Sequence, residues 1–261
     1  KGHSIMKIVV SKDAAALGAN AADYIADLIN AAVAKKGHAR IILSTGASQF
    51  TTLEALVKRD IDWSRVEMFH LDEYVDLPET HPASFRKYLR ERFISKVNLA
   101  AYHLVDGTPE CSSSLTEELR REPIDVGLIG IGENAHIAFN DPPADFDTTD
   151  AYIIVTLNET CRRQQVGEGW FATVDDVPRQ AVSMTVYQIL KCEEIVSCVP
   201  YAVKADAVQK TLENDKTNLI PATIMKGHDH FALFVDNDSF AKVDESKIRP
   251  AEGKTFTLEH V

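Results

Sequence analysis

The sequence predicts an α/β protein with a doubly wound, mostly parallel sheet and helices on both faces, a Rossmann-like arrangement. Two observations support this fold class. Short apolar runs alternate along the chain with longer amphipathic segments, as expected for repeated strand–helix units. Several of the short runs are apolar throughout instead of alternating, which is typical of strands buried on both faces of a parallel sheet.

The apolar runs and the segments between them give the expected elements in chain order. We expect strands at residues 7–10, 40–44, 66–71, 124–131, 152–157, 194–199 and 230–235. The segment 13–35 is rich in alanine and carries its larger apolar residues at helical spacing. We expect helices there and at roughly 49–58, 83–96, 113–120 and 202–213. Because no linker or repeat interrupts the chain, we interpret residues 1–261 as a single domain.

The overall composition argues against several classes of protein. A formal net charge of −11 disfavours a nucleic-acid binder, because phosphate repulsion has no global counterweight. No apolar run approaches the roughly 18 residues that a membrane span needs, so no membrane partner is expected. The four cysteines lack paired spacing, which disfavours a zinc site or disulfides and favours a reducing cytoplasm. The expected partner is a small molecule, and an anionic one needs only a local cluster of donors.

The first candidate site follows the expected strand at 40–44, because doubly wound folds bind ligands beyond the carboxyl ends of their strands. Here the sequence reads LSTGASQF, and Gly46 allows a tight turn with close approach of a ligand to the backbone. The hydroxyls of Thr45 and Ser48, with free N–H groups in the loop through Ala47, predict a phosphate-binding loop. An ordinary capped strand–helix turn is the alternative.

Two further strand ends carry groups suited to proton transfer. Asp72 and Glu73 follow the run 66–71 directly and point to opposite sides of an extended chain, so they should have different partners. Asp72 suits a general base, although capping of backbone N–H groups is the alternative. After the run 124–131 the chain reads GENAHIAFNDPP, where a carboxylate at Asp141 could hold the imidazole of His136 in one tautomer. Asn134 can form hydrogen bonds there but cannot carry charge.

The third glycine of a dinucleotide-binding GxGxxG motif is absent from this loop, because position 135 is alanine.

The basic residues that could bind an anionic ligand lie in other segments of the chain. Lys204 lies in the first turn of an expected helix, where a cation opposes the helix dipole unless an anion lies between them. Arg162 and Arg163 offer guanidinium groups that suit phosphate oxygens. Solvated surface charges are the alternative for each of these three residues.

Taken together, these stretches resemble the glucosamine-6-phosphate deaminase/isomerase family, and a paralogous branch of it more than its familiar deaminases. The resemblance spans roughly residues 7–240 and is carried by the segments LSTGAS, FHLDEYVDLPETHPASF, IDVGLIGIGENAHIAFNDPP, QVGEGWF, DDVPRQAVSMT and VPYAVKADAVQ. The related 6-phosphogluconolactonases share the fold and a similar glycine–histidine loop. The LDEY and HIAFN segments favour the aminosugar enzymes.

The resemblance implies roles for individual residues. It implies that Asp72 transfers the C2 proton of an aminosugar phosphate, that His136 helps to open the pyranose ring, and that Asp141 orients the histidine. It also implies that the loop Thr45–Ser48 and Lys204 bind the phosphate. We expect Glu73, beside Asp72 at the same strand end, to be a further site residue. The family reaction releases ammonia and leaves a ketose phosphate, and it needs no cofactor or metal.

The sequence departs from the family pattern at three places. Asn134 stands where the familiar deaminases have an aspartate, which removes one anionic neighbour of the histidine. Gly169 stands where they have a phosphate-binding arginine, a role that Arg162 could take over. The acidic stretch ADFDTTDAYI replaces the basic residues that bind an activating sugar phosphate, so we expect no such activation.

Three functional hypotheses therefore stand. The first is an aminosugar-phosphate deaminase that converts glucosamine 6-phosphate to fructose 6-phosphate and ammonia. The second is a lactonase or isomerase acting on another phosphosugar. The third is a non-catalytic sugar-phosphate sensor. The sequence leaves open whether the chain forms a homo-oligomer.

Overall fold

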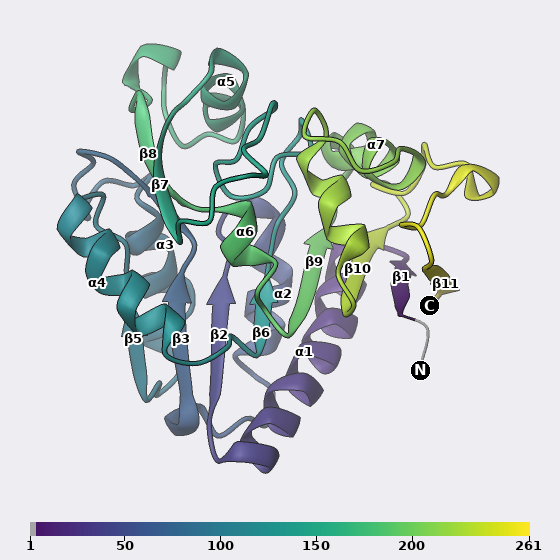
Figure 1. Cartoon of the computed structure of the whole chain (residues 1–261), viewed down its shortest axis with the longest axis horizontal. Helices are drawn as coiled ribbons and strands as arrows, with labels where there is room; N and C mark the ends of the chain where they lie inside the picture. The colour runs from purple at the N-terminus through teal and green to yellow at the C-terminus, as the bar shows by residue number, and fades with distance from the viewer. Residues whose placement is uncertain (1–3) are drawn as a thin grey trace.

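The structure is a computed structural model that describes residues 4–261. In this part of the chain, an eight-stranded sheet has the order β11-β1-β10-β9-β6-β2-β3-β5, and each neighbouring pair in it is parallel. Its strands are β1 (Ile5–Ser11), β2 (Ala39–Leu43), β3 (Val66–His70), β5 (Ala101–His103), β6 (Val126–Leu128), β9 (Glu194–Val199), β10 (Phe231–Asp236) and β11 (Thr255–His260). The predicted α/β fold with a mostly parallel sheet is confirmed (Figure 1).

Helices cover both faces of this sheet. The helices are α1 (Ala14–Lys36), α2 (Phe50–Leu56), α3 (Phe85–Arg92), α4 (Pro109–Arg120), α5 (Glu159–Gly167), α6 (Val186–Ile189) and α7 (Ala205–Glu213). Successive residues of β2 join different hydrophobic clusters, since Ile41 and Leu43 pack with α1, α2 and α3 whereas Ile42 packs with α4, α6 and α7. Both faces of the central strands are therefore buried, which explains why their sequences do not alternate.

Local signals set the boundaries of the longest helix. Asp13 caps α1 by accepting a hydrogen bond from Ala16 N, and Gly37 ends it in the left-handed conformation. These residues bound the helix expected at 13–35 within one residue. None of the helices in residues 4–261 is both long enough and apolar enough to cross a membrane.

Two expected strands differ from the structure. The run 124–131 is a strand only over Val126–Leu128, because residues 129–132 leave the sheet to form the loop that precedes His136. The run 152–157 does not enter the parallel sheet. It forms β7 (Tyr152–Thr156) of a small antiparallel sheet with β4 (Asp72–Tyr74) and β8 (Gln180–Met184), and its outer face is exposed.

The small sheet determines where the functional loops lie. Figure 1 shows β7, β8 and α5 beyond the carboxyl ends of the parallel strands. Since β4 follows β3 after a single residue, the chain that leaves the parallel sheet at His70 enters the small sheet at Asp72. Asp72 therefore lies at the junction of the two sheets.

Candidate active site

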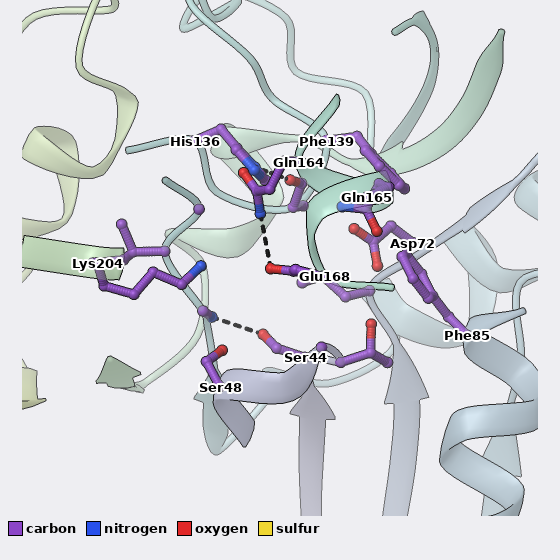
Figure 2. Close-up of a pocket in the computed structure, with 17 residues that line it drawn as sticks. Ser44, Ser48, Asp72, Phe85, His136, Phe139, Gln164, Gln165, Glu168 and Lys204 are labelled. Carbon is purple, nitrogen blue, oxygen red and sulfur yellow. Dashed lines mark hydrogen bonds between the residues drawn. The ribbon is translucent and has the colours of Figure 1, made fainter. Parts of the chain in front are cut away.

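A cavity at this junction collects residues from all four candidate strand ends. It encloses about 540 Å³ of space not filled by protein atoms, part of it open to solvent. Thr45, Gly46 and Ser48 line it from the end of β2, and Asp72, His136 and Lys204 line it from three other segments (Figure 2).

Ser44, at the end of β2, forms hydrogen bonds to the segment Leu128–Gly130 at the end of β6. This serine was assigned no role in the sequence analysis. Ser44 Oγ donates to Leu128 O at 2.5 Å and accepts from Gly130 N at 2.8 Å. Gly46 has a φ of 98°, and a Cβ there would meet no atom within 4 Å, so its backbone is open to a ligand. Ala47, at the start of the 3₁₀ turn Ala47–Gln49, does not line the cavity.

The adjacent carboxylates Asp72 and Glu73 do have different partners. Asp72 lines the cavity, and its side chain has no hydrogen-bond partner among the described residues. Burial raises the pKa of Asp72 well above its ordinary value, and the nearby Glu73 carboxylate adds to the rise. Glu73 points the other way and is completely buried. Its carboxylate accepts hydrogen bonds from the backbone N–H groups of Tyr74, Phe85 and Arg86 and from the side chains of Ser84 and Arg86.

The imidazole of His136 is held in one tautomer by the backbone. Its Nδ1 lies 2.6 Å from Ala138 O, and because a carbonyl oxygen only accepts, Nδ1 carries the proton of the neutral ring. Nε2 is then the free acceptor, and within residues 4–261 it has no hydrogen-bond partner. A Cβ at Gly132 would lie 1.9 Å from Nε2, so the ring needs glycine at this position. Ala135 and Ala138, on either side of the histidine, have positive φ values of 65° and 50°. Such strain is typical of functional loops.

Besides Ala47 and Glu73, three more predicted site residues lie outside the cavity lining. Asn134 Oδ1 accepts from His136 N at 3.2 Å, so the amide supports the turn and does not contact the ring. Asp141 Oδ1 lies 4.0 Å from His136 Nδ1, which is too far for a hydrogen bond. Arg162 Nη2 donates to Val174 O at 2.7 Å, and its side chain does not line the cavity.

Lys204 is the buried cation of the cavity. Its side chain is 4% exposed, and none of the hydrogen bonds or ion pairs found in residues 4–261 involves its ammonium group. Burial lowers the pKa of Lys204, and the carboxylates of Glu168 and Glu133 act in the opposite direction. The preceding Tyr201 has a φ of 81°, unusual for a non-glycine residue, and its N–H donates to Asp236 Oδ2 at 2.9 Å. An unpaired buried ammonium in a cavity is suited to an anionic ligand.

The sequence reasoning missed the residues that cover the cavity from the small-sheet side. Gln164 and Gln165 of α5 line it together with Glu168, the residue after that helix. Phe85 and Phe139 add an apolar wall. In the sequence, the segment that contains α5 stands out only for its arginines and for the family resemblance. Its short amphipathic pattern indicates a helix but not which ligand site the helix faces.

Known proteins resemble this chain in both sequence and structure. A family model described as glucosamine-6-phosphate isomerases/6-phosphogluconolactonase matches residues 12–233. A glucosamine-6-phosphate deaminase of Staphylococcus epidermidis is 33% identical over 233 residues, which cover 83% of this chain and 92% of that protein. A deaminase of the same name from Oenococcus oeni is 30% identical over 76% of this chain and 84% of that protein.

Two solved structures extend the similarity to the fold. A monomeric glucosamine-6-phosphate deaminase superimposes with a TM-score of 0.79 at 27% identity, covering 89% of this chain and 98% of that one. A 6-phosphogluconolactonase from Trypanosoma brucei superimposes with a TM-score of 0.76 at 15% identity, covering 93% and 100%. The second similarity concerns the fold alone.

Proposed function

This chain belongs to the family of glucosamine-6-phosphate isomerases and 6-phosphogluconolactonases, and from this premise we propose that it deaminates an aminosugar phosphate. The proposed reaction converts glucosamine 6-phosphate and water to fructose 6-phosphate and ammonia. The observation that carries the proposal is the shared cavity of three groups: the Asp72 carboxylate and the Lys204 ammonium, both unpartnered among the described residues, and the free Nε2 side of the His136 ring. Relatives about one-third identical that are named as deaminases support it.

The first proposed step opens the sugar ring. Lys204 and the backbone of the loop Thr45–Ser48 bind the phosphate. His136 Nε2 takes the proton of the C1 hydroxyl and passes a proton to the ring oxygen, while the C1–O bond to that oxygen breaks and the aldehyde forms. The hydrogen bond from Nδ1 to Ala138 O selects the tautomer in which Nε2 of the neutral ring is the acceptor.

The second step moves a proton between carbons. The ionised Asp72 carboxylate removes the C2 proton, and the electron pair forms the C1–C2 double bond of an enolamine while a proton of the C2 ammonium group moves to O1. Asp72 then returns its proton to C1, which leaves a protonated imine at C2. Water adds to this imine and the C–N bond breaks, releasing ammonia and the ketone. The raised pKa of Asp72 suits this exchange, because a carboxylate of raised pKa is a stronger base.

The test is ammonia release from glucosamine 6-phosphate by the purified protein. We expect the Asp72→Asn variant, which keeps the size of the side chain, to lose on the order of 10³-fold in kcat. Circular dichroism controls for folding. The proposal is abandoned if wild type and variant are equally inactive on a panel of aminosugar phosphates.

A lactonase is the second candidate function. Two observations support the lactonase hypothesis. Solved 6-phosphogluconolactonases have a similar fold, and Arg162 lies outside the cavity. Lactone opening on 6-phosphogluconolactone, followed by pH-stat, distinguishes it from the first proposal. Substrate binding without turnover of either compound would instead indicate a sugar-phosphate sensor, the third hypothesis.

Other features of the proposal follow from the sequence. We propose a single domain over residues 1–261 that works without cofactor or metal, since proton transfer and imine hydrolysis need neither. The four free cysteines support a cytoplasmic protein. The acidic stretch at 144–153 supports activity without activation by a second sugar phosphate. The oligomeric state stays open.

A further inference from the structure

Three charged side chains line the cavity, and none of them forms an ion pair within residues 4–261. They are the carboxylates of Asp72 and Glu168 and the ammonium of Lys204. Glu168 influences the pKa of Lys204, yet the two side chains do not come within ion-pair distance of each other. The cavity therefore holds opposite charges that are close but separate. Charges kept apart in this way are matched by a ligand that itself carries both signs.

Neutral donors fix the position of the Glu168 carboxylate. Gln164 Nε2 donates to Oε1 at 3.2 Å, and Trp170 Nε1 donates to Oε2 at 3.2 Å. Gln164 is itself held, because its Oε1 accepts from Glu133 N at 3.1 Å. Figure 2 shows the bond from Gln164 to Glu168, with the carboxylate lying between Lys204 and Asp72 in this view. These bonds orient the carboxylate without neutralising its charge, so a cationic group remains the partner that it lacks.

The two carboxylates of the cavity differ in what surrounds them. Asp72 is almost fully buried, and this burial raises the pKa of its carboxyl group. Glu168 is only partly buried and follows the C-terminus of α5. Since Asp72 transfers the carbon-bound proton in the proposed reaction, Glu168 is the carboxylate that remains available to bind a positively charged group of the ligand.

We propose that Glu168 binds the ammonium group of the substrate and thereby selects aminosugar phosphates over sugar phosphates with a hydroxyl at the same carbon. This inference rests on the proposed function. Lys204 then faces the phosphate and Glu168 the ammonium, so that each charged group of a zwitterionic ligand has one protein counter-charge. A hydroxyl at C2 gives Glu168 only an ordinary hydrogen bond, which is weaker than one between two charged groups.

The test compares two ligands that differ only at C2. Glucosamine 6-phosphate and glucose 6-phosphate are titrated calorimetrically into the Asp72→Asn protein, in which turnover is suppressed. We expect the aminosugar to bind about tenfold tighter or more. Adding Glu168→Gln should reduce this ratio to about one, mainly by weakening the aminosugar. The ratio should also fall from pH 6 to pH 9 with glutamate at 168, because the ligand ammonium loses its proton.

A matched control uses the same helix. Glu159 lies at the start of α5 and pairs with Arg163 on the surface, so Glu159→Gln should leave the ratio unchanged. The inference is overturned if Glu168→Gln leaves the preference intact, or if it tightens both ligands equally, since the carboxylate then only repels phosphate. If neither ligand binds any of these proteins and wild type releases no ammonia, the proposed function itself fails.

Discussion

Asp72 and Glu73 are neighbours in the chain and both are buried, yet their environments are opposite. Glu73 accepts five hydrogen bonds, including one from the Arg86 guanidinium. Asp72 has no side-chain hydrogen bond in the described part of the chain, and burial raises its pKa. Burying a carboxylate is costly unless hydrogen bonds replace its water. Glu73 therefore stabilises the fold. The unpaired carboxylate of Asp72 destabilises it and is available to a ligand.

The buried cations Arg40 and Lys204 show the same contrast. Arg40 is 1% exposed, and its guanidinium donates to Glu67 and to carbonyl oxygens at the end of α4 and just beyond it. Lys204 is 4% exposed and faces the cavity without a partner among residues 4–261. Satisfied and unsatisfied buried charges thus separate structural residues from site residues, and substitutions can test this separation.

The largest effect on stability is expected for Glu73→Gln. The amide keeps the shape but loses the charge that faces Arg86, and its NH₂ group meets N–H donors. We expect a loss of about 3 kcal/mol in the free energy of unfolding, measured by urea denaturation. Glu91→Gln on the exposed side of α3 is the control and should change it by less than about 0.5 kcal/mol. A stable Glu73→Gln protein with lost catalysis would reverse the roles of the two carboxylates.

The next largest effect is expected on catalysis in Gly132→Ala. The added methyl group would lie 1.9 Å from His136 Nε2, so the ring must leave its position. We expect kcat/KM for ammonia release to fall about 10²-fold, because a misplaced catalytic group commonly costs this much. Gly227→Ala is the control, since a Cβ there meets no atom within 4 Å. Unchanged activity in Gly132→Ala would remove His136 from the mechanism.

A smaller effect is expected for Lys204→Met, which should weaken substrate binding but stabilise the fold. Removing the ammonium should raise KM for the phosphorylated substrate at least about tenfold, since a charge-assisted contact is lost. Because an unpaired buried charge is removed, the free energy of unfolding should rise by about 1 kcal/mol. Lys210→Met on the exposed face of α7 should do neither. A destabilised Lys204→Met protein would show that the ammonium has a structural partner.

The sequence was informative about the strands and their ends because both signals are local. Apolar runs identify strands buried on both faces, and the glycines and polar residues that follow them identify the loops. The partners of a side chain are not local. Four of the five hydrogen bonds to Glu73 come from residues at the start of α3, more than ten residues further along the chain. Arg162 is held by the carbonyl of Val174, and Glu168 lines the cavity beside residues that are far from it in the chain, such as Asp72 and Lys204.

The smallest effect expected is a dependence of stability on pH that Asp72→Asn should abolish. The pKa of Asp72 is higher in the folded protein than in the unfolded chain, where a carboxyl group titrates near about 4. The folded state therefore holds the proton more tightly, and its stabilising contribution, complete below about pH 4, is lost as the pH rises through the folded pKa.

Asp72→Asn removes this loss, so urea denaturation should show that the variant gains stability relative to wild type between pH 4 and pH 8. The expected gain is on the order of 1 kcal/mol, since one pKa unit corresponds to about 1.4 kcal/mol. Asp62→Asn, at an exposed carboxylate whose pKa is instead lowered by the Ser64 hydroxyl, should not gain stability over this range. A variant at position 72 that is less stable than wild type at pH 8 would mean that the ionised carboxylate of Asp72 stabilises the fold, and the distinction drawn from Glu73 would then be lost.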